Sequence, residues 1–309
     1  MGRLSRDKRD VFYRRAKEKG YRARSAFKLL QIDSEFKIFE NVVRAVDLCA
    51  APGSWSQVLS DKLVSKNNEN EKSQSQIIAV DLQPMAPIEG VSCIQGDITS
   101  YETAKQILEP FCDENCDHDE TKYEKRAELV VCDGAPDVTG LHDLDEYLQA
   151  QLLMSAVKIT THVLVDGGTF VAKIFRGRHS NHLYAQLRLL FDRVSIAKPT
   201  SSRNSSLESF VVCQHFNKNS SIDVRNLSLD REDTILDVGE GSSSLPRCVP
   251  SFLACGDLSG WGEKAGTVMD ADKSYPMEES DYISPIHPPL APPHHQSQQA
   301  MEEKKQQKR

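Results

Sequence analysis

The stretch "VDLCAAPGSWSQVL", residues 46–59, decides the fold of this chain. An apolar, β-branched run over 42–48 leads into a turn of small residues, and 54–64 then has the pattern of a helix. A buried strand, a tight turn and a helix are therefore expected in direct succession. Gly53 removes a side chain from the turn, and the helix that follows offers free backbone N–H groups and a positive end. Such a turn can hold a carboxylate or a phosphate.

The same alternation of strands and helices continues to about residue 216. Strands are expected over 42–48, 76–85, 91–99, 127–140, 167–177, 193–199 and 208–216, and helices over 25–39, 54–64, 102–111, 143–164 and 181–191. This order predicts an α/β fold whose parallel sheet has helices on both faces. The last two strands are joined by "TSSRNSS", which is too short for a crossover helix, so they should pair antiparallel. We expect a Rossmann-like, seven-stranded, mostly parallel sheet with one antiparallel strand near its edge.

Positive charge is concentrated at the start of the chain. Residues 1–28 hold eleven Lys or Arg against three acids, a net charge of +8, whereas the whole chain carries −7. Aromatic residues are interleaved with these bases, a mixture suited to RNA phosphates with some stacking on bases. We expect a basic RNA-binding head that leads into the first helix. A solvated basic face is the simpler alternative, and a targeting segment is disfavoured by the three acids and the scarcity of serine.

Three parts of the chain follow from these patterns: the head, 1–28; a globular domain, 29–216; and a tail, 217–309. The tail is rich in Ser, Asp, Glu and Pro and has only weak strand-like pieces, such as 249–258. Such a composition buries too little apolar surface to offset chain entropy, so we expect the tail to be mostly extended or disordered. Its proline-rich end is typical of a linker or a docking segment, and an inert tail is an equal alternative. The charged stretch 112–126 is expected to be an exposed insertion.

Composition also bears on the cellular compartment and on metals. No apolar run approaches the roughly 18 residues that a membrane span needs, and charges stand where a signal peptide would have its apolar region. The eight cysteines are thinly spread, and several lie in strand-like runs, which favours a reducing, cytoplasmic location. Cys112, Cys116 and His118 form only a weak metal-ligand pattern, because no second Cys or His pair accompanies them. We expect no metal and no membrane contact.

Acidic residues at the strand ends suggest what the turn binds. In an open parallel sheet, ligands bind beyond the carboxyl ends of the strands, where the strand order reverses. Asp81 ends the second strand, where an acid could hold the two hydroxyls of a ribose, and Asp97 ends the third, placed to accept from an adenine amino group. A G-x-G-x-x-G is absent, so a dinucleotide is disfavoured, and a nucleoside that carries a carboxylate, such as S-adenosylmethionine, fits better. A single Asp at a strand end is more often a cap or turn residue, so the prediction rests on the joint pattern.

Five segments of this chain resemble the FtsJ/RrmJ family of RNA ribose 2'-O-methyltransferases. They are "YRARSAFKLLQID", "VDLCAAPGSWSQVL", "VCDGAPDVTG", "FVAKIFRG" and "KPTSSRNSSLESFVVC". The resemblance covers residues 1 to about 216 and implies that 29–216 is an S-adenosylmethionine-dependent methyltransferase domain. "DGAPDVTGLHD" and the tail segment "YPMEESDYISPIHPPLAPP" are similar to the eukaryotic cytoplasmic tRNA branch of the family. That branch implies a tRNA substrate, methylated at the nucleotide that opens the anticodon loop and at the wobble nucleotide.

The resemblance also implies a catalytic tetrad of Lys28, Asp133, Lys173 and Glu208. In the family, Lys173 would be the proton acceptor, for which its amine must be neutral, although the pKa of a free lysine is ~10.4. Lys28 and desolvation would lower the pKa of Lys173, whereas Asp133 and Glu208 would raise it. A second role therefore stays open, in which charged Lys173 polarises the hydroxyl and Asp133 takes the proton. Lys28 and Glu208 would hold the base and the ribose in register.

The remaining implications concern the cofactor, the RNA and the partners. By resemblance the cofactor residues are Gly53, Trp55, Asp81, Asp97 and Asp133. Trp55 would flank the cofactor, or equally pack the helix as a buried aromatic. Four basic residues could hold RNA phosphates or simply be solvated: Arg176, Arg178, Lys198 and Arg203. Members of the tRNA branch work with auxiliary proteins that select the modified position, one of them a WD-repeat protein. A ribosomal-RNA methyltransferase and a non-catalytic RNA-binding scaffold are the alternative functions.

Overall fold

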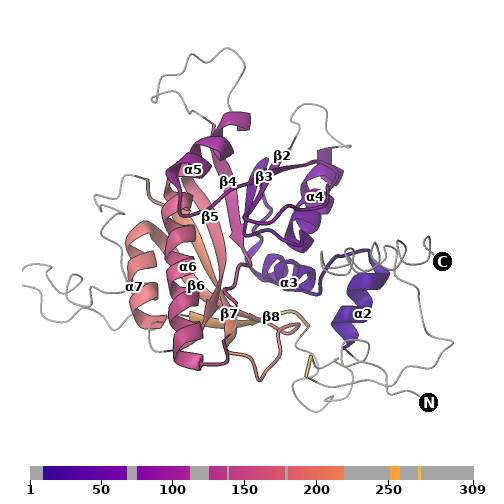
Figure 1. Cartoon of the computed structure of the whole chain (residues 1–309), viewed down its shortest axis with the longest axis vertical. Coiled ribbons are helices and arrows are strands. Elements are labelled where there is room, and N and C mark those ends of the chain that lie inside the picture. The colour runs from indigo at the N-terminus through magenta and orange to yellow at the C-terminus, as the bar shows by residue number, and fades with distance from the viewer. Residues whose placement is uncertain are drawn as a thin grey trace, which may run out of the picture.

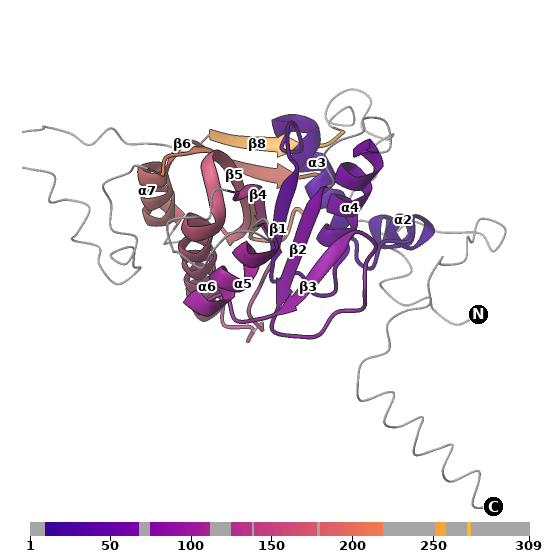
Figure 2. The same cartoon turned by 90° about the horizontal axis from the view of Figure 1, so that it is seen from above.

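The computed structural model describes residues 10–67, 75–111, 125–137, 139–177, 180–218, 251–257 and 271–272. One β-sheet runs through the centre of the protein, with helices on both of its faces (Figures 1 and 2). Its strands are β1 (Arg44–Leu48), β2 (Gln76–Asp81), β3 (Val91–Gln95), β4 (Ala127–Cys132), β5 (Leu164–Phe175), β6 (Phe191–Pro199), β7 (Glu208–Phe216) and β8 (Ser251–Cys255). The helices are α2 (Val11–Glu18), α3 (Ala26–Phe36), α4 (Ser54–Asn67), α5 (Tyr101–Leu108), α6 (His142–Val163) and α7 (Ser180–Leu190), with a short 3-10 turn, η1 (Glu109–Phe111).

The strand order is β3-β2-β1-β4-β5-β7-β6-β8. The chain moves outward from β1 to β2 and β3, then returns to the other side of β1 with β4, so the order reverses beside β1. A crevice opens at such a switch point beyond the carboxyl ends of the strands. β7 is antiparallel to both β5 and β6, and the remaining pairs are parallel. The predicted mostly parallel sheet with one reversed strand is confirmed.

The sheet has one strand more than the seven expected. β8 comes from the tail and pairs parallel with β6, in the register Ser195↔Ser251 to Pro199↔Cys255. Of the residues in β8 only Cys255 is buried, so the segment lacks the apolar alternation that identifies a strand in a sequence. Outside 217–218, 251–257 and 271–272, the predicted tail lies beyond the described residues, and its disorder stays a prediction.

Two apolar cores fill the space between the sheet and its helices. One core lies under α5, α6 and α7, and the other lies under α3 and α4. Alternate residues of the central strands enter opposite cores, because successive side chains of a strand point to opposite faces. In β5, for example, Phe170 and Ala172 belong to the first core and Val171 to the second. The face of β5 that carries the odd-numbered residues is therefore the face toward α3, which positions Lys173.

Two local features differ from the expected pattern. The helix expected from residue 25 begins at Ala26, and the hydroxyl of Ser25 does not cap it; this hydroxyl lies 2.6 Å from that of Ser54. β5 begins at Leu164, directly after α6, and its pairing with β4 shifts between Ala127 and Leu129.

Among the helices of the described segments, none is long and apolar enough to cross a membrane.

Candidate active site

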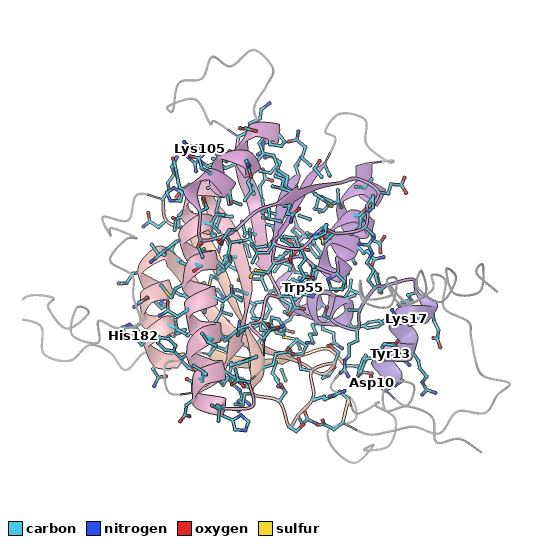
Figure 3. All side chains as sticks on the ribbon, viewed as in Figure 1. Asp10, Tyr13, Lys17, Trp55, Lys105 and His182 are labelled. Carbon is cyan, nitrogen blue, oxygen red and sulfur yellow. The ribbon has the colours of Figure 1, made fainter. Side chains whose placement is uncertain are left out.

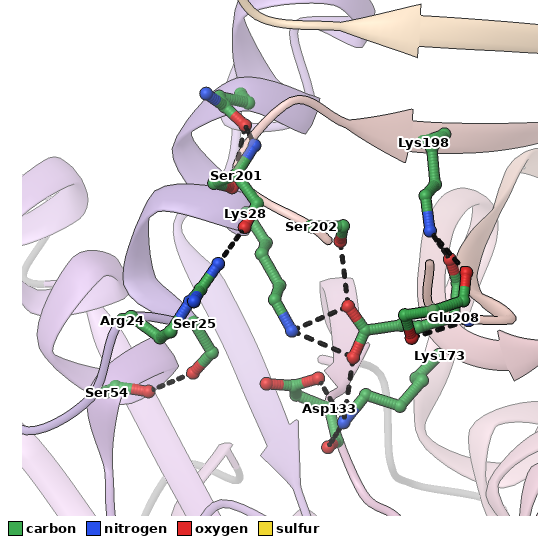
Figure 4. Close-up of polar contacts among 12 residues, drawn as sticks. Arg24, Ser25, Lys28, Ser54, Asp133, Lys173, Lys198, Ser201, Ser202 and Glu208 are labelled. Atoms are coloured by element: carbon green, nitrogen blue, oxygen red, sulfur yellow. Dashed lines mark hydrogen bonds and ion pairs between the residues drawn. The ribbon is translucent and has the colours of Figure 1, made fainter. Parts of the chain in front are cut away.

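The four residues of the predicted tetrad meet at the carboxyl edge of the central strands (Figure 4). Lys28 is in the first turns of α3, Asp133 directly follows β4, and Lys173 is near the end of β5. Glu208 begins β7, and because β7 is reversed, its first residue lies at the edge where β4 and β5 end. Lys173 is paired with Phe210, two residues from Glu208, so both charged side chains point toward α3.

Distances among these side chains define an alternating chain of charges. Lys28 Nζ lies 2.6 Å from Glu208 Oε1 and donates to Oε2 at 2.8 Å. Lys173 Nζ lies 2.7 Å from Asp133 Oδ1 and donates to the Asp133 carbonyl at 2.8 Å. Lys173 Nζ is also 3.8 Å from Glu208 Oε2, which joins the two pairs. The four side chains are only 10–16% exposed.

Burial and the neighbouring charges act against each other on this chain. Burial alone would raise the pKa of Glu208, but Lys28 and Lys173 lower it to about 2. Burial alone would lower the pKa of Lys173, but Asp133 and Glu208 outweigh burial and raise it above its usual value. Glu208 is therefore a carboxylate and Lys173 an ammonium group at neutral pH in the free protein. The sequence left two roles open for Lys173. This charge state favours the role in which charged Lys173 polarises the hydroxyl and Asp133 takes the proton.

Ser202 is a member of the site that the sequence did not reveal. Its hydroxyl donates to Glu208 Oε1 at 2.8 Å, and the residue is buried (Figure 4). Ser202 lies in a loop with three further serines nearby, so no sequence pattern distinguishes it. Its loop, 200–207, joins β6 to β7 and carries a hydrogen bond to Glu208 Oε1, the oxygen that also contacts Lys28 of α3.

The predicted phosphate ligands lie in different surroundings. Lys198 Nζ donates to the carbonyls of Ser206 and Glu208 at 2.9 and 2.6 Å, so it fixes the backbone before β7. Arg203 NH2 lies 3.5 Å from Asp10 Oδ2. Arg176 is exposed, with its guanidinium 5.2 Å from the ring centre of Phe252. Arg178 lies outside the described residues.

The turn between β1 and α4 is shaped by Gly53. Its φ of +102° is one that side chains rarely adopt, and an added Cβ would lie 2.7 Å from Ile88 Cδ1 and 2.8 Å from Arg22 NH1. Arg22 NH1 donates to the carbonyls of Pro52 and Ala86, both at 2.9 Å, and so ties the turn to the loop after β2. Arg22 belongs to the predicted RNA-binding head, but its guanidinium has this structural role.

Two acidic strand ends border the same crevice. Asp81 ends β2, and its Oδ2 accepts from the Ala51 N–H of the turn at 2.8 Å. Asp97 follows β3 by two residues, is exposed, and its Oδ1 accepts from the backbone N–H and the hydroxyl of Thr99, both at 2.8 Å. The hydrogen bonds from Thr99 lower the pKa of Asp97. Both carboxylates are thus held in place by hydrogen bonds from neighbouring turns, as expected of strand-end aspartates, and each has oxygen lone pairs that can accept from a ligand.

The side chain of Trp55 does not flank the turn, which corrects one of the two predicted roles. It is 1% exposed, its Nε1 donates to the Ser25 carbonyl at 2.9 Å, and its ring centre is 5.6 Å from that of Phe210 (Figure 3). The indole therefore packs α4 against the sheet. Trp55 is nevertheless in the first turn of α4, where backbone N–H groups have no acceptor within the helix. Any contact of Trp55 with a ligand at the turn would come from its backbone.

A buried acceptor lies beneath this turn. Asp47, in β1, is fully buried, and Ser56 donates to its Oδ2 at 2.6 Å, while its Oδ1 has no hydrogen-bond partner within the described segments. Burial raises the pKa of Asp47 to about 7. Acceptors at two strand ends, free N–H groups of α4 and a glycine without space for a side chain fit a nucleoside that carries an amino-acid group.

No group of three or more metal-ligating side chains occurs in the ranges that the structure describes. Cys112, Cys116 and His118 lie outside those ranges, so the expectation that they bind no metal stays a prediction.

The reversed strand β7, the glycine turn after β1 and the Lys-Asp-Lys-Glu cluster together define a Rossmann-like methyltransferase. The sequence profile of the family described as FtsJ-like methyltransferase matches residues 21–216. This chain belongs to the FtsJ-like methyltransferase family.

Named relatives and a solved structure agree with this assignment. The tRNA (cytidine(32)/guanosine(34)-2'-O)-methyltransferase of Mus musculus is 52% identical over 305 residues, which cover 96% of this chain and 86% of the relative. The protein of the same name in Schizosaccharomyces pombe is 50% identical over 299 residues, with 95% of each chain covered. A Plasmodium falciparum protein named as a ribosomal RNA methyltransferase has a similar structure, with a TM-score of 0.52, 25% identity and coverage of 63% of this chain and 98% of its own.

Proposed function

We propose that this protein is an S-adenosylmethionine-dependent tRNA methyltransferase that modifies ribose 2'-hydroxyls of the anticodon loop, at positions 32 and 34. The observation that carries the proposal is the buried chain Lys28–Glu208–Lys173–Asp133, which lies at the sheet edge where the glycine turn opens. The positions come from the names of the mouse and fission-yeast relatives. An rRNA substrate is less favoured, because the Aspergillus fumigatus rRNA methyltransferase is 41% identical and this chain covers only 25% of it.

The residues that would hold S-adenosylmethionine lie around the turn after β1. The backbone at Gly53 and Trp55 would meet the amino-acid part, and Asp81 and Asp97 would accept hydrogen bonds from the ribose hydroxyls and the adenine amino group. Asp133 borders both the donor side and the lysine side of the site. When bound, the donor supplies an electrophilic methyl group on a sulfonium and leaves as a neutral thioether.

The tetrad would orient the ribose and remove its proton. Charged Lys173 donates to the 2'-oxygen and holds it in place, which is the main source of acceleration in such a reaction. As the 2'-oxygen takes up the methyl group, the Asp133 carboxylate would accept the hydroxyl proton and pass it to solvent. Lys28 and Glu208 hold Lys173 and the ribose in register. The energetic argument for Asp133 is that Lys173 is already protonated in the free protein.

The basic head supports an RNA substrate. Val11, Phe12 and Ala16 of α2 are buried, whereas Arg15, in the helix, and Lys19, directly after it, are exposed and leave a basic face open to solvent. Such a basic face binds phosphates without reading sequence. By resemblance to the tRNA branch, auxiliary proteins, one of them a WD-repeat protein, would select the nucleotide, and the protein would be cytoplasmic.

Mapping of ribose methylation in cellular tRNA and rRNA, with and without the protein, tests the substrate. The proposal expects loss of 2'-O-methylation at tRNA positions 32 and 34 and unchanged rRNA. Loss confined to rRNA would establish the alternative, and no loss in either RNA would favour a non-catalytic scaffold.

A further inference from the structure

The strands that carry Asp133 and Lys173 separate at the site. β4 and β5 pair in register as far as Cys132↔Ala172, and this is their last paired position. Asp133 and Lys173 are the next residues on each strand. Backbone pairing therefore stops at the point where the distance between the two strands matters most for the reaction.

A side chain from α6 bridges this opening. Gln149 Nε2 donates to the carbonyl of Gly134 and to the carbonyl of Lys173, each at 3.1 Å. Gly134 is itself tightly packed, since an added Cβ would lie 2.7 Å from Cys49 Cβ and 3.2 Å from Leu152 Cδ2. One amide nitrogen thus ties the end of β5 to a backbone segment that has little freedom to move.

The amide of Gln149 is costly to keep in this place. The residue is 2% exposed, and its Oε1 is buried with no hydrogen-bond partner within the described ranges. A buried acceptor without a partner is unfavourable, whereas an apolar side chain of similar size would carry no such cost. The two donated bonds offset this cost, and both end on backbone carbonyls beside the tetrad, so a role in the site is indicated.

The two bonds act on both halves of the Lys173–Asp133 pair. The bond to the Gly134 carbonyl fixes the backbone directly after Asp133, and the bond to the Lys173 carbonyl fixes the backbone from which the lysine extends. Lys173 Nζ contacts both the carboxylate and the carbonyl of Asp133, so a small displacement of either strand end changes two contacts of the ammonium group.

We propose that Gln149 is a positioning residue for methyl transfer, which sets the separation of Asp133 and Lys173 without touching the substrate. The proposal rests on the proposed function for its kinetic test and on the structure alone for its spectroscopic test.

The test compares Gln149→Met, which keeps the size and removes the donor, with Gln186→Met as the matched control. Gln186 is a glutamine of α7 that is also buried, 3% exposed, and its amide contacts His182. We expect Gln149→Met to lower kcat for tRNA by about tenfold or more. KM for tRNA and the affinity for S-adenosylmethionine should stay within about twofold of wild type, and Gln186→Met should keep wild-type kcat.

Two further measurements separate positioning from stability. Gln149→Glu keeps the size and can donate only while protonated, so its kcat relative to wild type should fall as the pH rises from about 6 to 9. The 15N resonance of the Lys173 ammonium, identified by its loss in Lys173→Arg, should move in Gln149→Met and not in Gln186→Met. The Lys173 resonance can be measured without enzymatic activity. If Gln149→Met does not fold, Gln149→Glu serves for the same measurement.

The outcomes distinguish this inference from the proposed function. Wild-type protein that does not methylate tRNA even when an extract supplies auxiliary factors contradicts the proposed function, and the Lys173 resonance then decides the role of Gln149. A lowered melting temperature with unchanged kcat and an unmoved Lys173 resonance would show that Gln149 is structural only, and would overturn the inference.

Discussion

Lys173 is the residue whose charge decides how the proton leaves the ribose hydroxyl. Its Nζ is held between Asp133 and Glu208, and these carboxylates raise its pKa in spite of burial. A neutral amine would have to be produced before it could act as a base, and that would make the reaction strongly dependent on pH.

The pH profile of a single turnover checks this point. With Lys173 charged and Asp133 as the acceptor, we expect the rate of methyl transfer to be nearly constant from about pH 6 to 9. If neutral Lys173 were the base, the rate would rise about tenfold per pH unit over this range. Lys173→Ala should keep cofactor affinity and lose methyl transfer by at least about 100-fold, whereas Lys105→Ala, on the exposed face of α5, should resemble wild type.

Glu208 links the site to stability in acid. Its pKa is lowered from 4.5 to about 2 in the folded protein, so the carboxylate stabilises the fold above about pH 4.5, and this contribution is lost as the pH falls toward 2. The shift corresponds to about 3 kcal/mol of unfolding free energy. As the pH falls between these values, the free energy of unfolding, measured by urea titration, should therefore decrease less in Glu208→Gln than in wild type. Glu102→Gln, whose carboxylate is largely exposed, is the control, and equal pH dependence in all three proteins would contradict the assignment.

At the scale of elements, the turn between β1 and α4 is the proposed site of cofactor binding. Gly53→Ala should lower the affinity for S-adenosylmethionine by more than about tenfold, because the new Cβ would displace Arg22 or Ile88 as well as strain the backbone. Gly167→Ala is the matched control, since Gly167 also has a positive φ, of +79°, but open space around it. Calorimetric titration of both variants with S-adenosylmethionine separates the effect of the crowded Cβ from that of backbone strain. Equal affinities of the two variants for S-adenosylmethionine would argue against a donor site at this turn.

Apolar patterns predicted the elements that border the two cores. The helix α6 was located by its helical periodicity, and the strands β1, β4 and β7 were located as short apolar runs that are buried on both faces of the sheet. The strand β8 gave only part of a weak strand-like piece, 249–258, because its pairing uses backbone groups and buries only Cys255. Strand ends and family motifs predicted the tetrad, which the structure brings together.

Residues that act through the backbone could not be predicted in this way. Gln149 and Ser202 contact residues 24 and 6 positions away in the chain, and their types are common in helices and loops. Trp55 is the opposite case. Its place in a motif suggested a ligand contact, but its indole packs in the core. Burial and long-range contacts, which decide these roles, exist only in the folded chain.

At the scale of the whole molecule, head, loop and tail meet beside the site. Asp10, before α2, accepts from Arg24 and lies near Arg203 of the loop 200–207. Asp272, from the tail, accepts from the backbone N–H of Asn204 and of Ser205 at 2.7 and 3.3 Å. The neighbouring Ala271 packs against apolar residues of α2, Val11 and Phe12. Segments far apart in the chain therefore fix the loop that carries Ser202.

Asp272→Ala tests this connection. We expect a several-fold loss in kcat/KM for tRNA with unchanged cofactor affinity, because the loop would no longer hold Ser202 against Glu208. Asp166→Ala is the control, since Asp166 is also an aspartate that accepts from a backbone N–H, that of Lys218, at 2.9 Å. Wild-type kinetics in Asp272→Ala would show that the tail contact has no part in the reaction.

The proposed dependence on auxiliary proteins also belongs to the scale of the whole assembly. We expect the purified protein alone to bind S-adenosylmethionine but to methylate tRNA poorly, since the positions would be selected by its partners. Full activity of the purified protein, measured against the same protein in an extract, would contradict this expectation.

Transfer of a labelled methyl group to defined tRNAs tests the central claim most directly. The acceptor is a tRNA with ribose at positions 32 and 34, compared with the same tRNA carrying deoxyribose at both, and an extract of cells that lack the protein supplies any auxiliary factors. We predict incorporation into the first tRNA, none into the second, and none into either with Lys173→Ala. Equal incorporation into the deoxyribose tRNA would place the methyl group elsewhere than on the 2'-oxygen and contradict the account.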